Sequence, residues 1–357
     1  MPTYKDEKRG TWYCKFYYQD WTGKRKQKKK EGFKTQREAK EFEREFIRKS
    51  KADCSMLFSS LIELYFEDCQ SRLKPTTIDN KKYIINLKIL PYFKDMPLNT
   101  IDATTVRKWQ NELISYRDEN GNPYSQTYLK TVNNQLSAIM NYARKYYKLP
   151  ENPVVICGSM GKSNAESMKF WTLEEFKQFI PAIEDKLLSK VMFELLFWTG
   201  MRSGELLALT LNDFDFEEKT VRINKNYTRL NGEDLILTPK TPKSKRTITL
   251  PDFICDMVQD YVTHLYDYKP KERLFPVTKS YLDHEMRRGC QKSGVKKIRV
   301  HDIRHSHASL LIEQGFPPLL ISERLGHEKI QTTLQTYSHL YPNKHNLVAD
   351  KLQELNN

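Results

Sequence analysis

A segment rich in proline and glycine near the middle of the 357-residue chain indicates where one folded part ends and the next begins. It starts at Leu149-Pro150-Glu151-Asn152-Pro153 and runs through Gly158 and Gly161 to about Met168. This composition is typical of an exposed connection between domains, because proline and glycine interrupt regular structure. Two or three domains are expected for a chain of this length. We therefore expect separately folded domains on the two sides of this segment.

Residues 1–50 form a basic unit with many strand-forming side chains. They hold 16 Lys and Arg against 8 Asp and Glu, which is +8 of the total net charge of +14. The aromatic run Trp12–Tyr18 favours a strand, Trp21-Thr22-Gly23-Lys24 predicts a turn, and a lysine-rich return strand follows. Thr35-Gln36-Arg37-Glu38 is a capping box that opens a helix. We expect a small sheet with a helix on its back; the alternative is a solvated lysine-rich tail.

Residues 56–150 are predicted to be helical, because apolar residues recur there with a helical period. A first helix carries Leu57 and Leu61, and Pro75 opens a second helix. The last helix of this part is expected over about 125–147. No internal repeat of the solenoid type is visible in the sequence.

Residues 169–357 combine helices with short strands. Thr172-Leu173-Glu174-Glu175 is a second capping box, and helices are expected near 172–181, 186–199 and 203–210. Short strands are expected near 213–216, 219–224, 235–240 and 245–249, and helices return toward the C-terminus. The predicted fold class is mixed α+β and mostly helical: a small N-terminal sheet with a helix, a helical middle domain, and a C-terminal domain of helices with a small antiparallel sheet.

Separate motifs of the C-terminal part supply two arginines, two histidines and one tyrosine. They are Thr199-Gly200-Met201-Arg202-Ser203-Gly204-Glu205, His301-Asp302-Ile303-Arg304-His305, Leu325-Gly326-His327 and Thr336-Tyr337-Ser338-His339. These side chains suffice to cut a phosphodiester without a metal, because a tyrosine can attack phosphorus while cations hold the charge on the non-bridging oxygens. Arginine suits that role, since its planar fork binds two oxygens and stays charged.

The spacing His301-x-x-Arg304, then Gly326-His327, then Tyr337 ten residues later resembles the tyrosine recombinase family. The resemblance is to integrases of temperate phages and integrative elements of Gram-positive bacteria, and it covers nearly the whole chain. It implies an arm-site DNA-binding domain at 1–50, a core-binding domain at 56–150 and a catalytic domain at 169–357. It further implies a site-specific DNA recombinase that works through a 3′-phosphotyrosyl bond and a Holliday junction to integrate and excise a mobile element or prophage.

The resemblance assigns a role to each site residue. Tyr337 is the expected nucleophile, and Arg202 and Arg304 are the expected phosphate clamp. His301 is expected to accept the Tyr337 proton or to contact the phosphate, and His327 to donate a hydrogen bond to a non-bridging oxygen. From its position three residues after Arg202, Glu205 is expected to orient the guanidinium.

The leaving 5′-hydroxyl needs a proton, which the family takes from a lysine on a β-hairpin. Here the expected hairpin is Thr238–Arg246, which contains several cations. The pattern Lys-Thr favours Lys240 as the general acid. Lys243 and Lys245 are alternative acids or phosphate contacts.

Further basic and polar residues are candidate DNA contacts, and each of them has the simpler interpretation of a solvated surface side chain. The candidates are Lys24, Arg25, Lys26, Lys28, Lys30, Lys74, Thr76, Lys81, Lys130, Lys243 and Lys245. Lys28 and Lys30 alternate along the return strand, so they are expected to share one face of the N-terminal sheet.

Neither a cofactor nor a metal is expected. His301, His305 and His307 are close in sequence, but the H-E-x-x-H pattern is absent and no cysteine is near enough to complete a site. His305 and His307 are therefore expected to be packing histidines. The six cysteines form no C-x-x-C pair, which favours reduced thiols. No segment has the length of a membrane span, and a cytoplasmic, nucleoid-associated location is expected.

The strongly basic charge indicates an acidic partner, most plausibly nucleic acid. The resemblance implies that this partner is double-stranded DNA at core and arm attachment sites. The resemblance implies a homotetramer on DNA and admits an excisionase or a DNA-bending accessory protein. The amphipathic tail Asn346–Leu355 either packs on its own domain or exchanges between subunits. Two alternatives stay open: a DNA-binding regulator whose cutting site has decayed, and a resolvase or invertase of the same chemistry.

Overall fold

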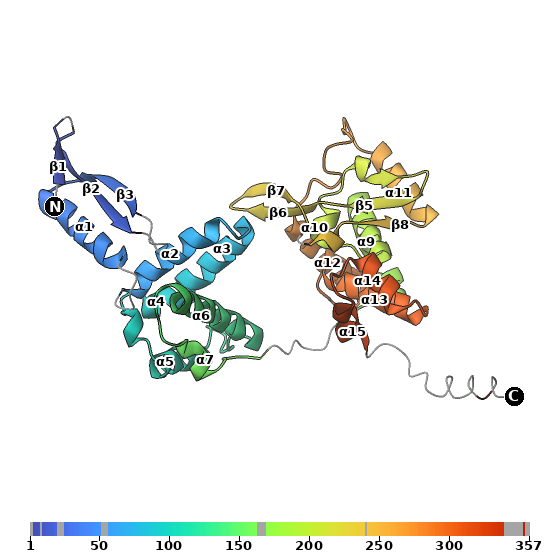
Figure 1. Ribbon diagram of the computed structural model, residues 1–357. Helices are drawn as coiled ribbons and strands as arrows, with labels where there is room; N and C mark the ends of the chain where they lie inside the picture. Colours follow the sequence, from blue (N-terminus) through green and yellow to red (C-terminus); the bar gives the residue numbers. More distant parts are fainter. Residues whose placement is uncertain are drawn as a thin grey trace. The chain divides into compact units, whose positions relative to one another are not determined.

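The structure is a computed structural model that describes residues 3–7, 9–19, 25–50, 56–162, 169–239, 241–338 and 353. The chain divides into two compact units, Met1–Glu166 and Ser167–Asn357 (Figure 1). Helices predominate and the sheets are small and antiparallel. The predicted mixed, mostly helical fold class is therefore confirmed, while the division into three domains stays a prediction.

The N-terminal part of the first unit is a three-stranded antiparallel sheet covered on one face by a helix (Figure 1). The elements are β1 (Thr3–Asp6), β2 (Thr11–Gln19), β3 (Arg25–Phe33) and α1 (Gln36–Ser50). Cys14, Phe16 and Ala39 form its buried core, with Phe42 and Phe46 of α1 packed against them. The Thr35 hydroxyl accepts the Glu38 amide at 3.2 Å, which caps the helix as the sequence predicted.

The rest of the first unit is a helical bundle with its own hydrophobic core. Its elements are α2 (Phe58–Gln70), α3 (Pro75–Ile84), η1 (Ile85–Ile89), α4 (Leu90–Phe93), η2 (Leu98–Thr100), α5 (Ala103–Ser115), α6 (Gln126–Tyr146) and α7 (Pro153–Cys157). The predicted helix start at Pro75 and the long helix near 125–147 are confirmed.

The segment from Leu149 to Met160 is folded onto this bundle, so the prediction of an exposed connection there is wrong. Asn152 caps the short helix α7 and its side-chain amide donates to the Ser137 carbonyl of α6 at 3.0 Å. Leu149, Val154 and Met160 are buried. Val155 and Ile156 of α7 stay exposed, so the segment is anchored by some of its apolar side chains while the proline and glycine residues shape a cap and a turn of the bundle.

The second unit carries the remaining elements around one large core and a smaller cluster formed by α13, α14 and α15. They are α8 (Leu173–Phe179), η3 (Ile180–Ile183), α9 (Leu187–Thr199), α10 (Ser203–Leu206), η4 (Leu211–Asp213), β4 (Phe214–Asp215), β5 (Thr220–Ile223), β6 (Asn226–Leu230), β7 (Glu233–Leu237), η5 (Pro242–Ser244), β8 (Arg246–Thr249), α11 (Asp252–Thr263), α12 (Lys279–Ser293), α13 (Asp302–Glu313), α14 (Pro318–Leu325) and α15 (Ile330–Tyr337). The predicted capping box at Thr172 and Glu175 is present.

The strands of this unit form two separate sheets. One has the order β4-β5-β8, and the other is the hairpin β6-β7, which turns at Asn231 and Gly232 with positive φ at both residues. The predicted hairpin over Thr238–Arg246 is wrong, because β7 before this segment pairs with β6 while β8 after it pairs with β5. The segment therefore connects two sheets, and it contains the short helical turn η5.

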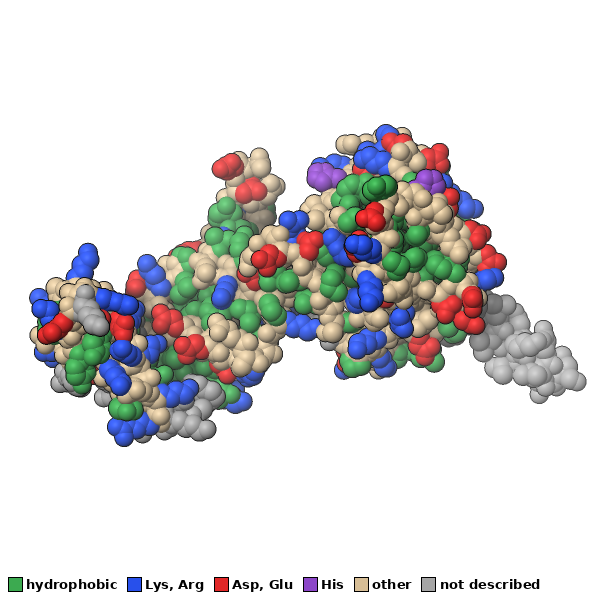
Figure 2. All heavy atoms as spheres, turned by 90° about the horizontal axis from the view of Figure 1, so that it is seen from above, with side chains coloured by type: hydrophobic (Ala, Val, Ile, Leu, Met, Phe, Trp, Pro, Cys, Tyr) green, Lys and Arg blue, Asp and Glu red, His purple; other side chains and the backbone are tan. Residues whose placement is uncertain are grey.

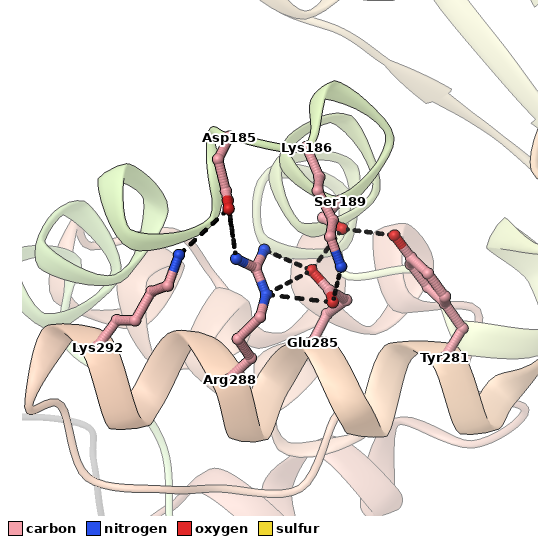
Figure 3. A network of polar contacts seen from close by, with 7 residues as sticks. All are labelled: Asp185, Lys186, Ser189, Tyr281, Glu285, Arg288 and Lys292. Carbon is pink, nitrogen blue, oxygen red and sulfur yellow. Dashed lines mark hydrogen bonds and ion pairs between the residues drawn. The ribbon is translucent and has the colours of Figure 1, made fainter.

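A buried carboxylate joins α12 to the start of α9 (Figure 3). Glu285 of α12 accepts hydrogen bonds from the Ser189 hydroxyl at 2.8 Å and from the Lys186 ammonium at 2.8 Å. The Arg288 guanidinium bonds the same carboxylate and reaches Asp185 at 2.7 Å. Burial would raise the pKa of Glu285, but these partners hold it below its ordinary value.

No helix in the described ranges is long and apolar enough to cross a membrane. The cysteines described there, Cys14, Cys69, Cys157, Cys255 and Cys290, are all buried and unbridged.

Replacing Glu285 by alanine should destabilise the second unit by about 3 kcal/mol, because the change leaves buried cationic and hydroxyl groups without their acceptor. Asp185→Ala is the control, since it removes the exposed end of the same network and should cost clearly less stability than Glu285→Ala. Urea unfolding of both variants measures the difference. Equal losses of unfolding free energy in the two variants would mean that the network does not depend on the Glu285 carboxylate.

Candidate active site

The first arginine of the site follows a tight helix end. Helix α9 ends at Gly200, whose φ of +64° is left-handed, and Arg202 then begins α10. A Cβ atom on Gly200 would lie 2.6 Å from the His307 ring and 2.8 Å from Leu325. Glycine is therefore required both by the backbone conformation and by the close approach of α13 and α14. The turn holds the half-exposed Arg202 side chain at the end of a buried helix.

A buried carboxylate holds Arg202 and a second arginine together. Glu205 accepts a hydrogen bond from the Arg202 guanidinium at 2.8 Å, as the sequence predicted, and one from the Arg246 guanidinium at 2.9 Å. Burial would raise the pKa of Glu205, but Arg246 and Arg202 keep it below its ordinary value, so the carboxylate is ionised. Arg246 was not among the predicted site residues, although it ends the cation-rich run that the sequence analysis singled out.

Arg304 is almost completely buried and bonds two backbone carbonyls. Its guanidinium donates to the Gly200 carbonyl at 2.9 Å and to the Leu325 carbonyl at 2.6 Å. Burial lowers its pKa to about 9, and the charges of Arg202 and Arg246 act in the same direction. Arg304 remains cationic at neutral pH and ties the end of α9, next to Arg202, to the end of α14, next to His327.

His327 follows the left-handed Gly326 at the end of α14. Its Nδ1 lies 2.8 Å from the hydroxyl of Thr333, a fully buried residue of α15. Burial lowers the pKa of His327 to about 3, with Arg304 and Arg202 adding to the shift, so the ring is neutral at pH 7. If the Thr333 hydroxyl donates to Nδ1, Nε2 carries the proton and can donate to an anion. Sequence reasoning missed Thr333, since one threonine in a polar run carries no signal.

Tyr337 is the last residue of α15 and is packed among Ala308, Ile312 and Leu325 with 1% of its surface exposed. Its hydroxyl lies 2.6 Å from Nδ1 of His305. Burial raises the pKa of Tyr337 to about 12, although the charge of Arg304 acts in the opposite direction. The predicted packing role of His305 is therefore incomplete, because its ring also bonds a hydroxyl of the site.

His301 directly precedes α13, makes no side-chain hydrogen bond that caps the helix, and is partly exposed. Its ring meets the His305 ring edge-on, with centroids 5.4 Å apart. Desolvation, Arg304 and Arg202 lower the pKa of His301. The structure thus brings His301 to the two arginines and to His305.

The cations of the connecting segment have different positions. Lys240 lies outside the described residues. Lys243 is exposed on the turn η5, and Lys245 is exposed directly after it. A Cβ atom on Gly326 would lie 3.1 Å from the Lys243 carbonyl, so this turn sits directly beside His327.

The predicted DNA contacts of the N-terminal sheet divide between its two faces. Lys28 and Lys30 pair with Phe16 and Cys14, and their ammonium groups lie over the rings of Phe46 and Phe42 on α1. They therefore point to the helix-covered side. Lys26 pairs with Tyr18 on that side too, and Lys24 lies outside the described residues.

The open face of this sheet carries Tyr13, Lys15, Tyr17, Arg25 and Lys29. Lys15 and Lys29 are cross-strand partners, and the Arg25 guanidinium stacks 4.4 Å from the Tyr17 ring. Figure 2 shows many Lys and Arg side chains on this N-terminal part, at the left of the view. Cationic groups held over aromatic rings are partly ordered in advance, which favours binding to a polyanion.

The candidates in the helical bundle also differ in exposure. Lys81 donates to the Tyr65 hydroxyl and to the Gln135 side chain, each at 2.9 Å, so it ties α3 to α2 and α6. Burial lowers its pKa. Lys74 is exposed at the start of α3, and Thr76 and Lys130 are half-buried.

The histidines of α13 are engaged in hydrogen bonds. His305 bonds Tyr337, and Nε2 of His307 accepts from the Arg324 guanidinium at 3.1 Å. Within the described ranges, no group of three or more His, Cys, Asp or Glu side chains is arranged to hold a metal ion.

The structure thus places arginines around a histidine and a buried tyrosine, which are the side chains that the sequence analysis expected of a phosphodiester-cleaving site. Comparisons with known proteins identify the family. Family models match residues 169–344 as the phage integrase family, 57–114 as a phage integrase N-terminal SAM-like domain and 2–50 as an arm DNA-binding domain. The ICEBs1 integrase of Bacillus subtilis is 34% identical over 339 residues, covering 88% of this chain and 87% of that protein. The integrase of Staphylococcus phage L54a is 26% identical and covers 84% and 94% of the two chains.

The fold is also that of solved integrases. The Tn1549 transposon integrase in complex with a circular intermediate DNA has a TM-score of 0.69 at 18% identity, with 83% of this chain and 99% of that chain covered. A lambda integrase dimer bound to a COC′ core site has a TM-score of 0.60 at 18% identity, with coverage of 94% and 93%. The chain belongs to the phage integrase family and is a tyrosine-type site-specific recombinase.

Thr333→Val should lower DNA cleavage by about ten- to a hundredfold, because it removes the hydroxyl that fixes the His327 ring while keeping the side-chain volume. Thr332→Val is the control, since Thr332 is exposed one residue earlier on the same helix. Cleavage of a suicide substrate nicked beside the core site gives the rates. A Thr333→Val rate equal to that of the control would contradict the positioning role.

Proposed function

We propose that Tyr337 attacks the scissile phosphate and forms a 3′-phosphotyrosyl bond to DNA. In this step the Oη–P bond forms, the bond from phosphorus to the 5′ oxygen breaks, and the leaving oxygen takes up a proton. The energy of the phosphodiester is kept in the new bond, so a 5′-hydroxyl can reverse the reaction without ATP. The observation that carries the proposal is the buried Arg304, which joins the backbone next to Arg202 to the backbone next to His327.

The groups around Tyr337 have complementary roles in this proposal. Arg202 and Arg304 hold the charge that builds on the non-bridging oxygens, and the neutral His327 donates a further hydrogen bond. Glu205 and Arg246 hold Arg202 in place, so little reorganisation is needed at the moment of reaction. Lys240 is proposed as the general acid, with Lys243 and Lys245 as the alternatives.

The proposed substrate is double-stranded DNA at two kinds of site. The match of residues 2–50 to an arm DNA-binding domain supports contact with arm sites, and the helical bundle is proposed to bind the core site together with the catalytic unit. A homotetramer would cut and exchange strands in pairs through a Holliday junction. The resemblance to the ICEBs1 integrase supports integration and excision of a mobile element over resolution of dimers.

A Tyr337→Phe variant should bind core DNA normally and form no covalent adduct, since phenylalanine keeps the packing and loses the nucleophile. The measurement is trapping of the chain on a nicked suicide substrate, followed by denaturing electrophoresis. Tyr261→Phe is the control, because it removes another buried tyrosine hydroxyl of the same unit. Adducts that persist in Tyr337→Phe would assign the nucleophile to another residue.

The open face of the N-terminal sheet is the proposed arm-site contact. Lys15 and Arg25 are exposed on this face, while Lys28 and Lys30 lie over the rings of α1. The pairs Lys15 with Arg25 and Lys28 with Lys30 carry equal charge, so comparing their removal separates direct contact with DNA from a general effect of net charge.

Lys15→Ala with Arg25→Ala should weaken binding to arm-site duplexes and reduce the steepness of log affinity against log salt by about 2, because each phosphate contact that is lost removes the release of about 0.9 counterion. The double variant Lys28→Ala with Lys30→Ala should change the slope by less than about half of the change expected for Lys15→Ala with Arg25→Ala. Fluorescence anisotropy of the full chain, over a salt series with duplexes tiling the flanks of the integrated element, provides the slopes. Equal slopes for the two double variants would remove the open face from the proposed interface.

A further inference from the structure

The hydroxyl of Tyr337 has a hydrogen-bond partner that the sequence analysis assigned elsewhere. His301 was the expected proton acceptor, but the hydroxyl lies 2.6 Å from Nδ1 of His305, one helical turn later on α13. The rings of His305 and Tyr337 have their centroids 5.6 Å apart. The contact therefore involves the atom that would attack phosphorus, and it is made by a side chain that has no role in the proposal above.

The protonation states on the two sides of this hydrogen bond suit a transfer of the proton to histidine. Burial lowers the pKa of His305 to about 4; His301, Arg304 and Arg299 act in the same direction, and Asp302 acts against them. His305 is therefore neutral at pH 7, with a free lone pair on Nδ1 when Nε2 carries the proton. Tyr337 keeps its proton in the absence of DNA, and with this tautomer its hydroxyl donates the hydrogen bond to Nδ1.

We propose that His305 is the catalytic base that takes the proton of Tyr337 during attack on the phosphate. This inference rests on the proposed role of Tyr337 as the nucleophile. As the Oη–P bond forms, the Oη–H bond breaks and Nδ1 of His305 gains the proton, while the leaving 5′ oxygen is protonated by the separate general acid. On religation the imidazolium returns its proton to Oη, so no further reactant is needed.

The bound substrate makes His305 a better base than it is in the free protein. The groups that face its ring are His301, Asp302, Arg304 and Arg299 from α13 and the residues before it, His327 from the end of α14, and Tyr337 from α15. Arg304 depresses the basicity of His305 while its charge is unpaired. A phosphodiester anion between Arg202 and Arg304 compensates that charge, so proton uptake by His305 becomes easier when the attack begins.

If His305 is the base, removing its ring slows DNA cleavage, whereas an inhibitory role of the same hydrogen bond predicts faster cleavage. Tyr337 is 1% exposed, so its hydroxyl must become accessible when DNA binds. If His305 only kept Tyr337 in an inactive position, removing the His305 ring would free the hydroxyl and speed DNA cleavage. If His305 only positioned the tyrosine, an acceptor that cannot take up a proton would be sufficient.

The test compares His305→Asn, His305→Ala and His301→Asn in cleavage of the nicked core substrate. Asparagine keeps an oxygen close to the position of Nδ1 and cannot take the proton, so both His305 variants should lose about 10²- to 10⁴-fold in single-turnover rate, the range typical of general base catalysis. His301→Asn should lose less. Binding of core DNA and the midpoint of thermal unfolding verify that the variants are folded.

Chemical rescue separates a base from a structural role. Trifluorotyrosine at position 337 has a more acidic hydroxyl, and it should recover most of the loss in both His305 variants; added imidazole should partly restore His305→Ala. Wild-type or faster cleavage by His305→Asn would overturn the proposal, and so would a loss that neither rescue changes. The Tyr337→Phe variant tests the nucleophile separately from the base. A covalent DNA adduct in that variant would show that Tyr337 is not the nucleophile, whatever the role of His305.

Discussion

The arrangement of the active site depends on one buried guanidinium. Arg304 donates to the carbonyls that end α9 and α14, and these carbonyls lie two residues from Arg202 and from His327. A cation that is almost fully buried is costly unless its donors are satisfied. Here the backbone satisfies some of them, and the charge of the group remains. The same side chain thus joins two helix ends and supplies positive charge to the site.

Around this guanidinium, Arg202 and His327 are each held by a residue with no proposed contact to the substrate. Glu205 holds Arg202 and Arg246, and Thr333 holds His327. Gly200 permits α13 and α14 to approach the end of α9 closely. Such supporting contacts keep the acting groups in place before substrate arrives, which is the main source of electrostatic catalysis.

The sequence was sufficient for the parts of the site that follow from local patterns. The helix starts at Thr35, Pro75 and Thr172 and the Arg202–Glu205 pair were predicted, because caps and short spacings act over a few residues. Contacts between distant segments were missed, among them Arg246 with Glu205 and His305 with Tyr337. A run of cations or of histidines does not indicate which member faces inward.

Two predictions about backbone layout were wrong for a related reason. The strands flanking Thr238–Arg246 pair with different neighbours, and the proline-rich segment after Leu149 packs on the bundle. Strand pairing and burial depend on residues far away in the chain. A turn-forming composition therefore indicates an irregular backbone, but it does not indicate which strands pair or whether the segment is buried.

The crowding of arginines in the second unit has a consequence for its thermodynamics. Arg202, Arg246 and Arg304 lie close enough to lower the pKa of Arg304, and Glu205 compensates only part of their charge. The unliganded fold therefore carries internal repulsion that a bound phosphodiester relieves. Ligands that favour the native state raise its melting temperature. The catalytic unit should consequently be most heat-resistant when engaged with its substrate, and the relief of repulsion within the protein adds to the free energy of DNA binding.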